Sequence, residues 1–319
     1  MRERVLIGAA ELAADLQVTG GTHGDPREGA PVLLDVRWAL GMTDGVERYR
    51  AGHLPGAVYV DLETELAAPA SPSAGRHPLP SAAGFQEAAR RWGVRQDSRV
   101  VVYDGVGGTS AARAWWLLRW FGLDDVRILD GGLDAWVAAG HALEVGTVTA
   151  EPGDVVVRPG GMSVLDADDA AALADGDGVL LDARAAERYR GEVEPVDPQA
   201  GHIPGALSAP TTGNLGEDGR FLDDATLRAR FAELGVHAVE AAVSHAGRAD
   251  GALAGRADGP REDPGGPAAV GVYCGSGVTA SHEVAALAAV GVEAALYPGS
   301  WSQWSNDPTR EVATGDSAR

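Results

Sequence analysis

The sequence of 319 residues contains no lysine, so all 26 of its basic residues are arginines. A protein without lysine cannot form a Schiff base through a side-chain amine, which excludes that class of covalent catalysis. It has a single cysteine, Cys274, so an intramolecular disulfide is impossible and a reducing, cytoplasmic location is expected. Residues 1–10 lack the apolar core and cleavage site of a secretory signal peptide, which agrees with that expectation.

The sequence also lacks long apolar runs and has few positive charges relative to negative ones. No run is long enough to cross a bilayer, which excludes a membrane protein. The net charge of −20 disfavours nucleic acid and anionic lipid, leaving a small molecule or another protein as the expected partner. The length exceeds the usual size of a single core and predicts two domains.

Cys274 stands where an apolar, strand-like run (268–273) meets a helix-like stretch (279–290). Gly275 and Gly277 allow the backbone to curl so that successive N–H groups point inward. The positive end of the following helix favours a thiolate. These features predict a nucleophile, although a free cysteine is also commonly a small buried hydrophobic residue.

Four blocks of sequence occur twice and in the same order. They are residues 33–37, 52–57, 100–104 and 130–136 in the first half, and residues 180–184, 201–206, 270–274 and 298–304 in the second. The block Gly-His-X-Pro-Gly-Ala is present in the copy with Asp104 as well as in the copy with Cys274. We therefore interpret it as a structural turn, and His53 and His202 as non-catalytic.

Each copy alternates short β-branched runs with helical patterns, which predicts an α/β fold with a parallel sheet and helices on both faces. The expected strands include 32–36 and 99–103, and the expected helices are 85–92, 111–121, 223–234 and 279–290. The aromatic stripe of Trp115, Trp116 and Trp120 is expected in the core. We predict domain 1 at 1–145, a linker at 146–163 and domain 2 at 164–319.

Residues 237–267 interrupt the second copy directly before the run that leads to Cys274. Their Ala, Gly, Arg and Asp content predicts a surface insertion, at least partly disordered, with a lid over the active loop as the alternative.

Two tandem copies, the paired Leu-Asp-X-Arg and Gly-His-X-Pro-Gly blocks and the single cysteine together resemble the rhodanese family of sulfurtransferases. The resemblance implies two tandem rhodanese-like domains, the first non-catalytic because Asp104 replaces the cysteine. The loop 274–280 is similar to that of 3-mercaptopyruvate sulfurtransferases, whereas thiosulfate-preferring members usually carry basic residues at the positions of Gly275 and Ser276. A neutral loop favours a donor with one carboxylate over a compact dianion.

The resemblance implies a ping-pong transfer in which Cys274 takes sulfur from 3-mercaptopyruvate and passes it to a thiol, thioredoxin or cyanide. No metal or organic cofactor is implied. Ser276, His77 and Glu63 match a serine, histidine and carboxylate set for proton transfer, and Arg188 matches the arginine that binds the substrate carboxylate. The N–H groups expected to hold the sulfur anion belong to the loop and the helix start, namely Gly275, Gly277, Val278 and Thr279.

The two arginines that follow the second Leu-Asp pair are expected to have different partners. With a neutral loop, Arg188 is expected to supply most of the attraction for the donor, whereas Arg184 is expected to pair with Asp182. The segment 192–198 departs from the family because it is acidic where relatives carry another arginine.

Thiosulfate is the rival donor for the same chemistry at Cys274. A cysteine phosphatase also uses a thiolate in a loop before a helix, but it would need an arginine near the end of that loop. A non-enzymatic sulfur-binding or scaffolding module would suit the first copy, where Asp104 stands, better than the second.

Overall fold

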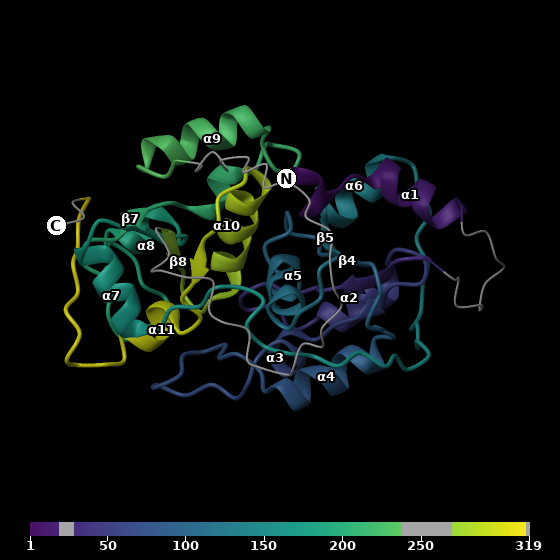
Figure 1. Cartoon of the computed structure of the whole chain (residues 1–319), viewed down its shortest axis with the longest axis horizontal. Coiled ribbons are helices and arrows are strands. Elements are labelled where there is room, and N and C mark those ends of the chain that lie inside the picture. Colours follow the sequence, from purple (N-terminus) through teal and green to yellow (C-terminus); the bar gives the residue numbers. More distant parts are fainter. Residues whose placement is uncertain (19–28, 238–269, 317–319) are drawn as a thin grey trace, which may run out of the picture.

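The computed structural model of the chain describes residues 1–18, 29–237 and 270–316. These residues form two sheets of parallel strands, and helices cover both faces of each sheet (Figure 1). The α/β architecture predicted from the two sequence copies is confirmed.

The first sheet contains five strands in the order β1-β5-β4-β2-β3. The strands are β1 (Leu6–Ile7), β2 (Val32–Asp35), β3 (Val58–Tyr59), β4 (Val100–Tyr103) and β5 (Val126–Leu129). Its helices are the 3-10 helix η1 (Arg2–Arg4), α1 (Ala9–Val18), α2 (Gly45–Ala51), α3 (Leu62–Glu65), α4 (Ala82–Arg91), α5 (Ala111–Trp120) and α6 (Gly132–Ala138). Asp35 of β2 is paired with Tyr103 of β4, so Asp104 follows a central strand at its carboxyl end.

The second sheet repeats this centre with four strands in the order β7-β6-β8-β9. The strands are β6 (Val179–Asp182), β7 (Leu207–Ser208), β8 (Val270–Tyr273) and β9 (Ala295–Leu296). Its helices are α7 (Ala167–Asp175), α8 (Ala186–Tyr189), the 3-10 helix η2 (Thr211–Asn214), α9 (Asp224–Glu233), α10 (Val278–Ala289) and α11 (Ser300–Trp304). Asp182 is paired with Tyr273, so Cys274 leaves the sheet at the edge where parallel sheets bind ligands.

Alternate residues of a buried strand point to opposite faces, and both faces are apolar here. In β4, Val102 packs with α4 and α5, whereas Val101 packs with α1 and α6. In β8, Val272 packs with α9 and α10, whereas Tyr273 packs with α7 and α11. These two central strands are therefore buried on both sides, which explains why their sequences are continuous apolar runs.

Helices α5 and α10 pack against each other between the two sheets, so one apolar core runs through both halves (Figure 1). Trp115 and Trp116 of α5 are fully buried there, and Trp120 is partly buried against it, as the aromatic stripe predicted. Because α10 begins directly after the Cys274 loop, this packing brings the loop to the junction of the two halves.

The four predicted helices are present as α4, α5, α9 and α10, with ends that differ by at most a few residues. The clearest difference is α4, which begins at Ala82 rather than at residue 85. Ser81 is its N-cap and accepts a hydrogen bond from the Gly84 N–H at 3.1 Å, so the cap sets the start of the helix.

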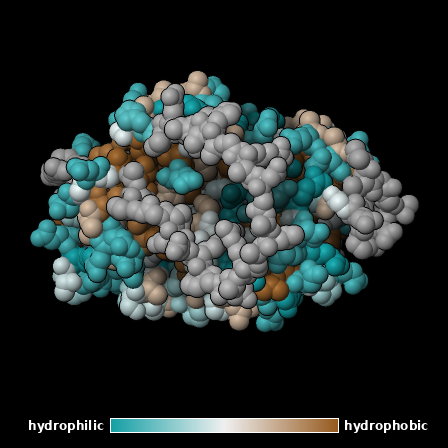
Figure 2. Space-filling model, in the orientation of Figure 1, coloured by the Kyte–Doolittle hydropathy of each residue, from teal (hydrophilic) through white to brown (hydrophobic). Residues whose placement is uncertain are grey.

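The proposed domain limits, 1–145 and 164–319 with a linker at 146–163, stay a prediction. The predicted insertion at 237–267 lies, apart from His237, outside the described residues. Within the described part of the chain, no helix is both long and apolar enough to span a membrane. On the face shown in Figure 2, hydrophilic and hydrophobic residues are interspersed, and hydrophobic ones are most visible over the second half, at the left.

Candidate active site

Cys274 lies in a short loop between β8 and α10 and is only 1% exposed. Its Sγ accepts a hydrogen bond from the Gly277 N–H at 3.1 Å. Gly277 has a φ of 78°, and a Cβ at this position would lie 2.7 Å from the carbonyl oxygen of Pro298. The loop therefore needs glycine at 277 to direct this N–H at the sulfur.

Helix α11, within the predicted block 298–304, holds the other side of the loop. The N–H groups of Trp301 and Ser302 donate to the carbonyl oxygens of Cys274 and Gly275, each at 2.9 Å. Ser300, in the left-handed region with a φ of 53°, accepts the Cys274 N–H through its Oγ at 3.2 Å. The carbonyl groups of the loop are thus bound on the α11 side, which stabilises one loop conformation.

Ser276, His77 and Glu63 form one hydrogen-bonded chain, although they come from both halves of the sequence. His77 Nδ1 lies 2.7 Å from the Ser276 Oγ, and His77 Nε2 lies 3.2 Å from both carboxylate oxygens of Glu63. Burial lowers the pKa of His77, and Glu63 opposes this shift only in part, so the imidazole is neutral at pH 7. With Glu63 accepting the Nε2–H, Nδ1 is free to accept the Ser276 proton.

The loop before His77 reaches this place because it docks on α11. Ser71 and Gly75 close a tight turn, and the Arg76 N–H donates to the Ser302 Oγ at 3.0 Å. A Cβ on Gly75 would lie 2.7 Å from the Gly299 carbonyl oxygen, so the contact is close. A turn that projects onto the second half thus brings His77 to the Cys274 loop.

Arg113, on α5, is a residue of the site that the sequence analysis missed. It is fully buried, and its guanidinium donates to the carbonyl oxygens of His77 at 2.9 Å and of Gly277 at 3.4 Å. Burial lowers its pKa to about 10, and the charge of Cys274 opposes that shift. Arg113 therefore brings a positive charge to the Cys274 loop from the first half. The available signal was the single charged residue in the otherwise apolar run 111–118 of the predicted helix.

Arg188 lies at the active loop, but it is neither alone nor unpaired there. Its guanidinium binds Glu194 at 2.7 Å and Asp197 at 3.4 Å. A Cβ on Gly275 would lie 2.8 Å from Nη2 of Arg76 and 3.5 Å from Nη1 of Arg188. The expectation that Arg188 supplies most of the attraction for the donor stays a prediction, and the first half adds the cations of Arg76 and Arg113 to the same loop.

Asp104 occupies in the first half the position that Cys274 has in the second. Its carboxylate is buried and accepts four backbone N–H groups at 2.8–2.9 Å, from Val106, Gly108, Ser110 and Ala111. Burial raises the pKa of Asp104, and these hydrogen bonds oppose that shift. The Asp104 carboxylate thus occupies the position in the first loop at which these N–H groups converge.

The repeated histidines stabilise the turns of their block. Nδ1 of His53 lies 2.9 Å from the Tyr49 carbonyl oxygen, and Nδ1 of His202 lies 2.8 Å from that of Tyr189. Both rings are buried and stack on the same tyrosines. Their structural role is confirmed.

The predicted Arg184 ion pair is also present, with Nη2 at 2.6 Å from Asp182, and Arg184 Nη2 donates in addition to the Gly201 carbonyl oxygen at 2.6 Å. The Leu-Asp-X-Arg block therefore holds the Gly-His-X-Pro-Gly-Ala turn. Among the described residues, no three His, Cys, Asp or Glu side chains gather as a group that could hold a metal ion.

Comparison with known proteins follows the same two halves. The model of the family described as rhodanese-like domain matches residues 23–139 and 166–307. A putative thiosulfate sulfurtransferase of Mycobacterium tuberculosis is 46% identical, covering 98% of each chain. A probable 3-mercaptopyruvate sulfurtransferase of Pseudomonas aeruginosa is 44% identical, covering 99% of this chain and 100% of the relative. The crystal structure of SseA from Escherichia coli, whose description names 3-mercaptopyruvate sulfotransferases and the rhodanese fold, matches with a TM-score of 0.70 and 33% identity, over 93% of this chain and 98% of SseA.

Proposed function

Because this chain belongs to the rhodanese family, we propose that it is a sulfurtransferase that moves sulfane sulfur from 3-mercaptopyruvate through a Cys274 persulfide to a thiol, a thioredoxin-like protein or cyanide. The observation that carries the choice of donor is the hydrogen-bonded chain of Ser276, His77 and Glu63 next to the cysteine. The cytoplasmic location and the identity of the acceptor are parts of this proposal.

In the first step the Cys274 thiolate attacks the sulfur of mercaptopyruvate. A sulfur–sulfur bond forms, the carbon–sulfur bond breaks, and its electron pair leaves on pyruvate as an enolate. The Gly277 N–H at 3.1 Å from Sγ and the guanidinium of Arg113 stabilise negative charge at the loop.

The enolate must gain one proton, and the thiol of the donor must lose one. Neutral His77 can accept the thiol proton through Ser276, with Glu63 stabilising the imidazolium, and can then return it to the enolate carbon. The proton therefore moves from the sulfur of the donor to the methyl group of pyruvate. The lowered pKa of His77 supports this role, because only the neutral ring can begin the transfer.

Asp104 supports the function proposed for the N–H groups of the active loop. Its carboxylate shows that a loop of this kind, in the equivalent position of the first half, directs four N–H groups at a single anion. In the second half, the N–H groups of Gly275, Gly277, Val278 and Thr279 would hold the outer sulfur of the persulfide. A thiolate or cyanide acceptor then attacks that sulfur and releases the Cys274 thiolate.

Thiosulfate is the second candidate donor, because Arg76 and Arg188 lie against Gly275 and could attract a dianion. With thiosulfate the leaving group is sulfite, which needs no proton, so proton transfer by the Ser276–His77–Glu63 chain would not be required. The proton chain therefore favours mercaptopyruvate.

Mass spectrometry tests the proposal directly, because Cys274 is the only thiol. Mixing the protein with mercaptopyruvate should add one sulfur atom, and Cys274→Ser should abolish both the adduct and turnover. An adduct that survives in Cys274→Ser would exclude the mechanism. A higher kcat/KM for thiosulfate than for mercaptopyruvate would exclude the proposed donor.

A further inference from the structure

The acidic segment 192–198 places two buried carboxylates on the arginines of the site. The side chains of Glu194 and Asp197 are 4% and 3% exposed. Glu194 Oε1 accepts the N–H groups of Val196 and Asp197 at 3.1 and 3.0 Å, which forms a tight turn. This turn directs the Asp197 carboxylate inward rather than into solvent.

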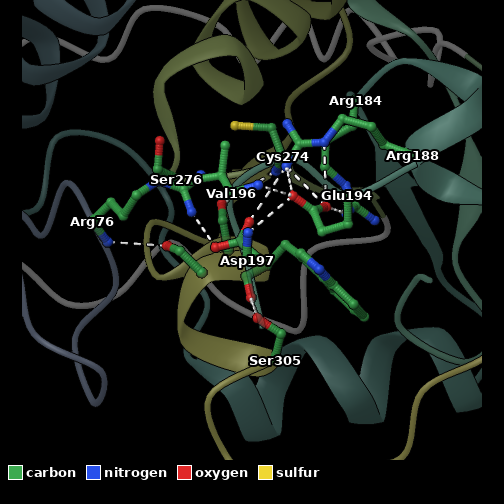
Figure 3. Close-up of polar contacts among 12 residues, drawn as sticks. Arg76, Arg184, Arg188, Glu194, Val196, Asp197, Cys274, Ser276 and Ser305 are labelled. Atoms are coloured by element: carbon green, nitrogen blue, oxygen red, sulfur yellow. Dashed lines mark hydrogen bonds and ion pairs between the residues drawn. The ribbon is translucent and has the colours of Figure 1, made fainter. Parts of the chain in front are cut away.

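Asp197 joins arginines from the two halves of the chain. One carboxylate oxygen binds Nη1 of Arg76, and the other lies 3.4 Å from Nη2 of Arg188 (Figure 3). These two guanidiniums are the ones that lie against Gly275, the residue after the nucleophile. Asp197 therefore binds the same cations that would attract the anionic group of a sulfur donor.

The two carboxylates divide the cations between them. Glu194 pairs with Arg188 at 2.7 Å and lies 3.4 Å from Arg184, whereas Asp197 is the acidic partner of Arg76. Arg184 is already bound to Asp182, so it offers little charge to a ligand. Without Asp197, the side of the site near Gly275 would hold one more uncompensated positive charge, which is the condition that favours a compact dianion.

We propose that Asp197 determines the donor specificity of this site: its carboxylate compensates Arg76 and Arg188, so that the site accepts donors with a single carboxylate and discriminates against dianions such as thiosulfate and sulfate. A donor carboxylate can exchange for Asp197 on the same guanidiniums, whereas a dianion brings a second negative charge close to Asp197 and Glu194. The inference rests on the proposed function for the direction of donor choice. The positions of Asp197 and the two arginines do not depend on that function.

The test compares Asp197→Asn with wild type and with Glu192→Gln. Glu192 belongs to the same segment, is exposed, and pairs with Arg190 rather than with the site, so this variant removes one negative charge at a position without these contacts. Asp197→Glu keeps the charge and serves as the conservative variant. For each protein, kcat/KM is measured with mercaptopyruvate and with thiosulfate, and inhibition by sulfate is compared with inhibition by pyruvate.

Asp197→Asn should raise the ratio of thiosulfate to mercaptopyruvate kcat/KM by about tenfold. The reason is that the repulsion between one unit charge and a dianion near a partly buried site is about twice the repulsion between that charge and a monoanion. Sulfate should inhibit Asp197→Asn at correspondingly lower concentration, whereas Asp197→Glu and Glu192→Gln should keep the wild-type ratio. General damage to the fold would lower kcat/KM for both donors by the same factor and leave the ratio unchanged.

An unchanged ratio in Asp197→Asn, or an equal change in Glu192→Gln, would overturn the inference. If Asp197→Asn does not fold, wild type alone decides: sulfate that inhibits at lower concentration than pyruvate contradicts the assigned role of Asp197. A wild type that forms no persulfide from mercaptopyruvate would refute the proposed donor only, because thiosulfate turnover and sulfate inhibition still report on Asp197.

Discussion

His77→Gln isolates the proton step from the rest of the site. Glutamine keeps a polar side chain between Ser276 and Glu63, but it cannot accept a proton. In the wild type, His77 Nδ1 lies 2.7 Å from the Ser276 Oγ, and the residue is 3% exposed, so solvent has little access to replace it. The Cys274 loop, α11 and the arginines do not depend on the imidazole, and sulfur attack should be retained.

General acid–base catalysis by a positioned side chain typically contributes at least about 100-fold. A loss of that size in kcat/KM for mercaptopyruvate corresponds to about 2.7 kcal/mol of transition-state stabilisation. Thiosulfate needs no proton on its leaving group, so its kcat/KM in the same variant should stay within about threefold, a change below about 0.7 kcal/mol. The ratio of mercaptopyruvate to thiosulfate kcat/KM should therefore fall by well over tenfold.

Steady-state kinetics with both donors, on wild type, His77→Gln and the control His141→Gln, measures this effect. His141 lies beside Trp136 in the first half, away from the site, and its replacement should leave kcat/KM with both donors unchanged. Equal losses with both donors in His77→Gln would refute the proton-transfer role, because they would indicate a structural one.

The pH dependence of the donor ratio provides a second measurement of the same step. Burial lowers the pKa of His77, so the neutral ring persists below the ordinary histidine range. The ratio of mercaptopyruvate to thiosulfate kcat/KM should stay constant from pH 8 to the ordinary histidine value of about 6.5 and fall only at lower pH. A fall that begins above pH 7 would contradict the reasoning. Ionisation of the shared nucleophile cancels in this ratio.

Two further predictions concern stability. Asp104→Asn should lower the free energy of unfolding by about 2–4 kcal/mol in urea titrations, because an amide cannot accept all four N–H groups. The control Asp134→Asn, at an exposed position, should lower it by less than about 0.5 kcal/mol, and an equally small loss in Asp104→Asn would show that the buried carboxylate is not needed. Burial raises the pKa of Glu283 from 4.5 to about 7, so its contribution to stability is present below pH 4.5 and is lost as the pH rises through 7. Glu283→Gln should thus be more stable than wild type by about 1–3 kcal/mol at pH 8 and show little gain at pH 4.5, and a gain that is equal at both pH values would contradict the assignment.

Local sequence patterns predicted much of the secondary structure. Short β-branched runs predicted the central strands, and the helix predicted over 111–121 from its helical pattern is α5 (Ala111–Trp120). The start of α4 was misplaced because a cap depends on the hydrogen bond of one side chain, Ser81, rather than on a hydrophobic period. The repeated blocks indicated two similar halves, but they contained no signal that α5 and α10 would pack together.

The sequence by itself determined the family and predicted the nucleophile and the non-catalytic first copy, because these depend on residue types in short and ordered blocks. Only the tertiary structure decided which charges surround Cys274. Arg76 and Arg113 come from the first half, and Asp197 comes from a segment that the sequence showed only as acidic. Electrostatic interactions act through distances of a few ångströms between residues far apart in the chain, and the packing of the two halves sets those distances.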